Sequence, residues 1–123
     1  MSEEVKILYV DDEFLNLCSF EMLFKEKYKI FTASGGKKGL EIFDKNDIKI
    51  VISDQKMPQM TGVEFLEEIC KKDDSTLRII HSGFSDSVEI KTALEKNVAQ
   101  FCLDKPLQQN ILTDIIEDYV KRI

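Results

Sequence analysis

The chain has little of what a cross-linked or membrane-spanning protein needs. Its three cysteines are odd in number, have no CxxC spacing and each lie in an apolar run (Cys18, Cys70 and Cys102). This pattern predicts reduced core thiols rather than a disulfide or zinc framework. No stretch reaches the roughly 20 apolar residues that span a bilayer, and the acidic residues 1–4 do not resemble a signal peptide. We therefore expect a cytoplasmic protein with no membrane partner.

Basic residues are scarce relative to acidic ones, with 17 Lys and Arg against 23 Asp and Glu and a net charge of -6. Because phosphate backbones bind Lys- and Arg-rich surfaces, this balance argues against direct nucleic-acid binding. A nucleotide site is disfavoured as well, since neither a GxxxxGKS/T nor a GxGxxG motif occurs. What remains is a chain of 123 residues, 43% of them hydrophobic, without repeats or linkers. This predicts one domain over residues 1–123.

Five short apolar runs predict β-strands, at residues 5–10, 28–33, 48–53, 77–82 and 99–103. Helical spacing of apolar residues lies between these runs and after the last, at residues 14–18, 40–43, 63–70, 90–94 and 111–123. Strict alternation of strand and helix predicts an α/β fold with a doubly wound parallel sheet, because parallel strands need long crossover connections.

Polar residues follow four of the predicted strands. They are Asp11, Asp12 and Glu13 after the first, Asp54 after the third, Ser82 and Gly83 after the fourth, and Lys105 and Pro106 after the fifth. In a parallel sheet these positions share one edge, where ligands bind. Three carboxylates placed together repel one another, so a cation is expected among them, and an all-oxygen set suits Mg²⁺ rather than zinc.

With the charge neutralised, one carboxylate could attack a phosphoryl group, while Lys105 and the Ser82 hydroxyl hold the phosphoryl oxygens. The product would be an aspartyl phosphate. Each residue taken alone has a simpler interpretation: Asp11 and Asp12 as a helix cap, Asp54 and Lys105 as turn residues, and Ser82 as a strand end. Their joint placement at four strand ends favours the chemical interpretation.

Four segments resemble the receiver domains of bacterial two-component signalling. They are KILYVDDE from Lys6, VISDQKMPQMTG from Val51, RIIHSGFSD from Arg78 and FCLDKP from Phe101. The resemblance covers essentially the whole chain. It implies a flavodoxin-like sheet of five parallel strands in the order 2-1-3-4-5, flanked by five helices.

The resemblance also implies roles for individual residues. Asp54 would be the phosphoacceptor. Asp12 and Asp54 would bind Mg²⁺ directly, Asp11 largely through water and Lys56 through its backbone carbonyl, with Mn²⁺ able to substitute. Lys105 would pair with the phosphoryl group, and its bond to Pro106 is expected to be cis.

Ser82 and Phe101 would be the switch pair. Ser82 would move to bond a phosphoryl oxygen, the Phe101 ring would turn inward, and the face of the fourth helix, fifth strand and fifth helix would change shape. The expected partners are a sensor histidine kinase or phosphotransfer protein, and an output domain or partner protein on that face. Phe101 stands where Tyr is commoner, and on the residues alone it could be a plain core aromatic.

Some positions depart from the family pattern. Lys56 and Phe84 stand at the two positions that tune the lifetime of the phosphoryl group, and Phe84 cannot orient an attacking water, so we expect slow self-dephosphorylation. His81 stands where most receivers carry an aliphatic residue. It precedes Ser82 in a strand, so we expect its side chain to point away from the site and to take no part in the phosphorelay. The runs DQKMP and SGFSD resemble receivers that are fused to regulatory output modules.

Two other functions compete with this interpretation. Haloacid-dehalogenase-type phosphatases also use a nucleophilic Asp and Mg²⁺, but they usually carry a second Asp two residues later, where this chain has Lys56. We therefore expect a signalling receiver that assists its own phosphorylation and slow dephosphorylation, rather than an enzyme. A phosphorylation-independent interaction module would have no need of the full set of Asp11, Asp12, Asp54, Ser82 and Lys105.

The seven apolar positions of residues 111–123 exceed one packed face and leave open a partner surface or a continuing helix.

Overall fold

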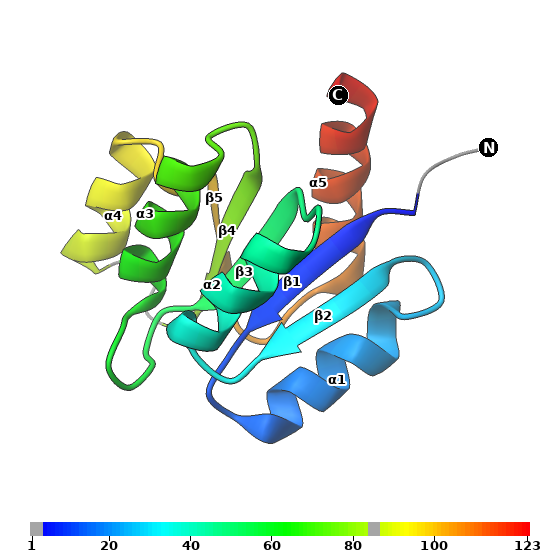
Figure 1. Ribbon diagram of the computed structural model, residues 1–123, viewed down its shortest axis with the longest axis horizontal. Coiled ribbons are helices and arrows are strands. Elements are labelled where there is room, and N and C mark those ends of the chain that lie inside the picture. Colours follow the sequence, from blue (N-terminus) through cyan, green and yellow to red (C-terminus); the bar gives the residue numbers. More distant parts are fainter. Residues whose placement is uncertain (1–3, 84–86) are drawn as a thin grey trace.

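The computed structural model describes residues 4–83 and 87–123, and strands and helices alternate along them (Figure 1). The elements are β1 (Lys6–Val10), α1 (Phe14–Phe24), β2 (Lys29–Ala33), α2 (Gly36–Lys45), β3 (Ile50–Asp54), α3 (Gly62–Lys72), β4 (Leu77–Ser82), α4 (Val88–Glu95), β5 (Phe101–Asp104) and α5 (Gln109–Arg122). The strands form one parallel sheet in the order β2-β1-β3-β4-β5. The predicted fold class and strand order are confirmed.

The helices cover both faces of the sheet (Figure 1). Side chains alternate between the faces along each strand, so Leu8 and Val10 pack with the α2, α3 and α4 side while Ile7 and Tyr9 pack with α1 and α5. Burial on both sides explains the continuous apolar runs of β1 and β3, at residues 7–10 and 50–52. The bounds of β4 are as predicted, and those of the other strands differ from the expected ones by one or two residues. The largest consequence is that Asp54 ends β3, because it still pairs with His81 of β4.

The starts of α3 and α4 are fixed by side-chain caps. Thr61 accepts a hydrogen bond from the Glu64 backbone N–H (3.2 Å), and the Glu64 carboxylate accepts one from the Thr61 N–H (2.9 Å). Ser87 accepts from the Ile90 N–H at 3.2 Å. These bonds satisfy backbone groups that a helix start leaves without partners. They hold both helix starts beside the carboxyl edge of the sheet.

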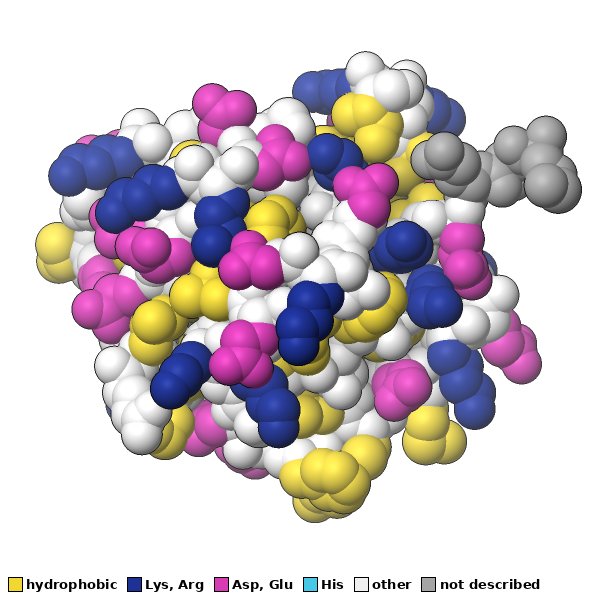
Figure 2. Space-filling view, viewed as in Figure 1, with side chains coloured by type: hydrophobic (Ala, Val, Ile, Leu, Met, Phe, Trp, Pro, Cys, Tyr) yellow, Lys and Arg dark blue, Asp and Glu magenta, His cyan; other side chains and the backbone are white. Residues whose placement is uncertain are grey.

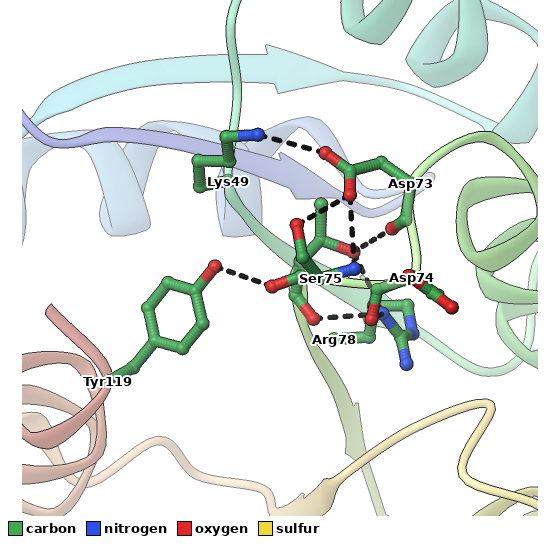
Figure 3. Close-up of polar contacts among 7 residues, drawn as sticks. Lys49, Asp73, Asp74, Ser75, Arg78 and Tyr119 are labelled. Carbon is green, nitrogen blue, oxygen red and sulfur yellow. Dashed lines mark hydrogen bonds and ion pairs between the residues drawn. The ribbon is translucent and has the colours of Figure 1, made fainter. Parts of the chain in front are cut away.

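A buried arginine closes the opposite edge (Figure 3). Arg78, at the start of β4, is 1% exposed. Its guanidinium donates to the backbone carbonyls of Thr76 (2.8 Å), Asp74 (3.2 Å), Val98 (2.8 Å) and Asn97 (2.9 Å), and to the Thr76 hydroxyl (2.9 Å). All five acceptors are neutral oxygens. Arg78 and these acceptors, called here the amino-end network, bind the loop before β4 to the loop before β5.

Two neighbouring contacts extend this region (Figure 3). The Tyr119 hydroxyl of α5 donates to the Ser75 carbonyl at 2.7 Å. Lys49 pairs with Asp73 at 2.9 Å, and Asp73 also accepts hydrogen bonds from Ser75. The loop between α3 and β4 is therefore fastened to both α5 and the start of β3.

The burial of the cysteines and of α5 differs in part from what the sequence predicts. The three thiols are unpaired, as predicted, but all are only half-buried rather than in the core. In α5, Leu112 and Ile116 are buried whereas Ile111 and the following Ile123 are exposed, so its apolar positions do not form a single packed face. Among the described residues, no helix is long and apolar enough to cross a membrane.

Acidic and basic side chains are interspersed over the face drawn in Figure 2. Hydrophobic side chains gather at its lower edge, in the region of α1 (Figures 1 and 2). The large exposed apolar residues of α1 are Phe14, Leu15, Met22 and Leu23. The drawn face thus carries mixed charge rather than the single-sign basic surface typical of nucleic-acid binding.

Candidate functional site at the carboxyl edge of the sheet

Carboxylates from two central strands meet at the carboxyl edge. Asp11 follows β1 and Asp54 ends β3, and these strands are neighbours in the middle of the sheet. Each of Asp11, Asp12 and Asp54 can offer one oxygen such that the three oxygens lie within 4.8 Å of one another. Glu13, beside them in the sequence, is not among the three. The donor set is all oxygen and acidic, which fits Mg²⁺ or Mn²⁺.

Lys105 brings the one ammonium group that ion-pairs with these carboxylates among the described residues. Its Nζ lies 3.2 Å from Asp54 Oδ1 and 3.6 Å from Asp11 Oδ2. The Lys105–Pro106 peptide bond is cis, as predicted. Asp11, Asp12, Asp54 and Lys105 are called here the carboxyl-end cluster. This cluster contains three carboxylates and one ammonium group.

The electrostatics of Asp54 reflect this imbalance. The side chain is largely buried, and burial together with the charge of Asp11 raises its pKa. Lys105 and the Gln55 backbone N–H, which donates to Asp54 Oδ1 at 2.8 Å, act in the opposite direction but do not cancel the effect. The folded chain therefore disfavours the ionised Asp54, and an added cation would relieve this cost.

Asp11 is fully buried and closely surrounded by donors. Its Oδ1 accepts from the Glu13 backbone N–H at 3.0 Å, and its Oδ2 accepts from the Asn16 amide at 3.0 Å and from the Tyr9 hydroxyl at 3.2 Å. The residue at the N-cap position of α1 is Glu13, and it makes no side-chain cap bond. The simple helix-cap interpretation of Asp11 is therefore wrong, because its carboxylate turns back toward the site.

The predicted switch residues lie on β4 and on the edge strand β5. Ser82 ends β4, is 1% exposed, and its carbonyl accepts from the Lys105 backbone N–H at 3.2 Å. Phe101 is 40% exposed on the edge strand β5, so its ring faces outward rather than into the core. Lys56 is exposed just beyond Asp54. Phe84 lies outside the described residues.

Sequence reasoning missed the role of Gln55. This buried amide accepts from the Val63 backbone N–H of α3 at 2.9 Å and donates to the Glu89 carboxylate of α4 at 2.7 Å. Glu89 also accepts from the Thr61 hydroxyl at 3.4 Å. The residue after the candidate phosphoacceptor thus joins two helices. A polar residue between Asp54 and the next apolar position was the only signal in the sequence.

Gly62 allows α3 to start against the backbone of the site. Its N–H donates to the Gln55 carbonyl at 3.0 Å. A Cβ at this position would overlap the carbonyl oxygen of Asp54. The absence of a side chain is therefore required by the close approach of α3 to Asp54.

His81 lies closer to the site than expected. It occupies the opposite face of β4 from Ser82, as predicted from the strand pleat, and is 5% exposed. Its Nδ1 nevertheless lies 3.2 Å from the Tyr9 hydroxyl, which donates to Asp11. The expectation that His81 points away from the site is therefore wrong. Asp54 pairs with His81 in the sheet and faces the same side, so the Tyr9 hydroxyl connects His81 to the carboxylates.

Comparison with known proteins agrees with the fold. Residues 7–117 match the family model of the response regulator receiver domain. The chain is 28% identical over 120 residues to the hydrogenase transcriptional regulatory protein HoxA of Cupriavidus necator, covering 97% of this chain but only 25% of that protein. It is 28% identical over 116 residues to sporulation initiation phosphotransferase F of Bacillus subtilis, covering 94% of this chain and 93% of that protein.

A solved structure extends the agreement to three dimensions. The response regulator receiver domain protein from Clostridium thermocellum is 33% identical and superposes with a TM-score of 0.88, over 96% of this chain and 95% of that one. Sequence, topology and the acidic edge of the sheet lead to one family. The chain belongs to the response regulator receiver domains, the signalling modules of phosphorelays.

Proposed function

We propose that Asp54 accepts a phosphoryl group from the phosphohistidine of a sensor histidine kinase or phosphotransfer protein, or from a small phosphodonor. An Asp54 carboxylate oxygen forms the new O–P bond as the P–N bond breaks, and the imidazole leaves with the electron pair and is protonated by solvent. The observation that carries this proposal is the buried Asp54 carboxylate, 3.2 Å from the Lys105 ammonium and beside two further carboxylates.

The carboxylate cluster is proposed to hold Mg²⁺ or Mn²⁺. Asp12 and Asp54 would bind it directly, Asp11 through water, and Lys56 through its backbone carbonyl. When bound, the cation neutralises the carboxylates and the charge that develops on the phosphoryl oxygens. The all-oxygen donor set and the raised pKa of Asp54 support this assignment.

Lys105 and Ser82 are proposed to hold the transferred group. The Lys105 ammonium, now shared between Asp54 and Asp11, would pair with a phosphoryl oxygen. Ser82 ends β4, the strand next to that of Asp54, and its hydroxyl would move to bond another oxygen. Both groups stabilise charge without themselves being consumed.

Phosphorylation is proposed to switch the α4-β5-α5 face, with Ser82 and Phe101 as the moving pair. The outward ring of Phe101 lies on that face and is available to turn inward. The Gln55–Glu89 bond supports a link to α4, because Gln55 is the chain neighbour of Asp54 and binds the first turn of this helix. The face would then present a different surface to an output domain or partner protein.

The chain is proposed to act as one receiver domain over residues 1–123, without turnover of a separate substrate. Self-dephosphorylation would be slow, tuned by Lys56 and Phe84. The chain spans about a quarter of HoxA, a transcriptional regulatory protein, but nearly all of sporulation initiation phosphotransferase F. Action with a regulatory output module and action as a single domain are both represented among these relatives.

Intact mass spectrometry after incubation with acetyl phosphate and Mg²⁺ tests the proposal. The native chain should gain about 80 Da, one HPO₃ group, and the gain should require Mg²⁺. Asp54→Asn should abolish it, whereas the control Asp47→Asn, at an exposed carboxylate outside the cluster, should keep it. Absence of any gain in the native chain would contradict the proposal and favour a phosphorylation-independent interaction module.

A further inference from the structure

Tyr9 is held from three directions beside the carboxyl-end cluster. Its ring is 2% exposed and stacks on Phe20 of α1, with centroids 4.1 Å apart and an interplanar angle of 3°. Its hydroxyl lies 3.2 Å from Asp11 Oδ2 and 3.2 Å from His81 Nδ1. A buried hydroxyl needs such partners, because leaving it without one is unfavourable. The side chain therefore has little freedom to turn.

The direction of the two hydrogen bonds follows from the groups involved. A phenol has one proton to donate, and the Asp11 carboxylate is a stronger acceptor than a neutral imidazole nitrogen. Tyr9 therefore donates to Asp11, and the phenolic oxygen accepts from His81 Nδ1–H. This assigns the neutral tautomer of His81 with the proton on Nδ1. It agrees with the other ring nitrogen, Nε2, which is buried without a hydrogen-bond partner among the described residues.

Asp11 Oδ2 is subject to competing attractions. Tyr9 and Asn16 hold it from one side at 3.2 and 3.0 Å, and the Lys105 ammonium lies 3.6 Å away. Without the Tyr9 hydroxyl, only Asn16 would oppose the ammonium, and Oδ2 would shift toward Lys105 into a closer ion pair. A closer ion pair would compete with any cation for the same carboxylate.

We propose that Tyr9 and His81 are a positioning pair that orients the Asp11 carboxylate for divalent-cation binding, with His81 fixing the Tyr9 hydroxyl and Tyr9 fixing Asp11. This rests on the cation site of the proposed function and names two residues that act on it from outside. Neither residue contacts the cation or the phosphoryl group. Their effect is on the affinity for the cation, as for other groups that orient metal ligands.

Isothermal titration calorimetry with Mg²⁺ alone measures this effect without phosphorylation. Tyr9→Phe keeps the ring and removes the hydroxyl, and should raise the dissociation constant for Mg²⁺ by about 10- to 100-fold. His81→Leu should raise it by a smaller factor. His81→Asn, which keeps an N–H donor near the Nδ1 position, should restore much of the lost affinity. Tyr28→Phe, which removes a buried tyrosine's 2.8 Å bond to Glu117 of α5, is the matched control and should bind as the native chain does.

A kinetic measurement separates positioning from general damage. In Tyr9→Phe, the Mg²⁺ concentration for half-maximal phosphorylation by acetyl phosphate should rise, while the rate at saturating Mg²⁺ should stay within about twofold of the native rate. Equal dissociation constants for the native chain and Tyr9→Phe would overturn the positioning role and leave the cation site standing. Equal weakening by Tyr9→Phe and Tyr28→Phe would also overturn it. A native chain that binds no Mg²⁺ would overturn the cation site itself, and the positioning role with it.

Discussion

The two edges of the sheet hold their polar side chains in opposite ways. At the start of β4, Arg78 places a full positive charge in the interior and surrounds it with five neutral oxygens, four of them backbone carbonyls. At the carboxyl edge, the carboxyl-end cluster brings three carboxylates together with the Lys105 ammonium, and burial together with the charge of Asp11 raises the pKa of Asp54. Asp11 and Asp54 are buried, as Arg78 is, but Arg78 meets only neutral acceptors whereas the two carboxylates repel each other.

This difference separates structure from function within one sheet. Buried polar groups that are fully hydrogen-bonded fix one conformation, whereas groups in electrostatic conflict are tolerated where a ligand or a reaction resolves the conflict. The amino-end network would gain nothing from a ligand. The carboxyl-end cluster would gain from a cation, and more so once phosphorylation replaces the Asp54 carboxylate with a more highly charged phosphoryl group. The following predictions test this contrast, beginning with the largest expected effect.

Replacing Arg78 should damage stability more than any change at the opposite end. Arg78→Met removes the donor to several buried carbonyls, and leaving such groups without partners should lower the free energy of unfolding by at least about 3 kcal/mol. Urea denaturation measures this change. Arg122→Met, which breaks an exposed pair with Asp118, is the control and should change it by less than about 1 kcal/mol. A loss at Arg78 no larger than at Arg122 would refute the contrast.

Acid should weaken the two ends in different pH ranges. Burial, with a contribution from Lys105, lowers the pKa of His81 from 6.5 to about 4. A group with a lower pKa in the folded state adds stability above its unfolded pKa, and this stability is lost as the pH falls through the folded pKa. For His81 the loss lies between pH 6.5 and 4 and amounts to at most about 3 kcal/mol. Hydrogen bonds from Ser75, followed by the bond from Lys49, lower the pKa of Asp73 to about 2. The stability that Asp73 contributes is therefore lost only below pH 3.8.

Unfolding free energies measured at intervals from pH 7 to pH 3 would separate these contributions. His81→Leu should flatten the decline between pH 6.5 and 4, while Asp73→Asn should leave that part of the curve unchanged. The opposite assignment, with Asp73→Asn flattening the decline above pH 4, would show that the acid sensitivity does not originate at the carboxyl edge.

Magnesium should stabilise the chain through the carboxyl-end cluster alone. At a concentration 100 times the dissociation constant, a ligand that binds only the folded state adds about 2.7 kcal/mol to the free energy of unfolding. Thermal unfolding with and without Mg²⁺ at pH 7 measures the gain. Asp54→Asn should lose most of it, but should be slightly more stable than the native chain without Mg²⁺, because the raised pKa of Asp54 marks an unfavourable charge. An undiminished gain in Asp54→Asn would place the cation elsewhere.

The smallest effect is expected at the margin of the amino-end network. Tyr119→Phe removes the hydroxyl that donates to the Ser75 carbonyl, a bond that is partly open to solvent. The free energy of unfolding should fall by about 0.5 to 1 kcal/mol, and the response to Mg²⁺ should not change. An altered Mg²⁺ response would show that the two ends of the molecule are coupled.

The residues at the carboxyl edge could be predicted, because the position of a residue at the end of its strand alone decides that it reaches this edge. In a parallel sheet, residues that end their strands share an edge whatever their side chains do, so Asp11, Asp54, Ser82 and Lys105 could be placed from the strand pattern. The strand order itself came from the family resemblance. It is what puts Asp11 and Asp54 on neighbouring strands.

The contacts around the site could not be predicted in this way. The Tyr9–His81 bond joins β1 to β4 across the intervening β3, so it depends on the length of each side chain and on the twist of three strands. The Gln55–Glu89 bond depends on where α4 starts, which a periodicity argument locates only within a few residues. The signal that was present was a polar atom in each of two aliphatic strands, at Tyr9 and His81.

The close approach at Gly62 has a consequence for recognising working receivers. A search that counts only the charged and hydroxyl residues would accept a chain with every catalytic group in place and alanine at position 62. In that chain the methyl group would meet the carbonyl oxygen of Asp54, so either α3 or the acceptor would have to move. Such a chain would keep the composition of the site and lose its geometry. In this chain, the missing side chain at position 62 is thus as necessary to the geometry of the site as the carboxylate beside it.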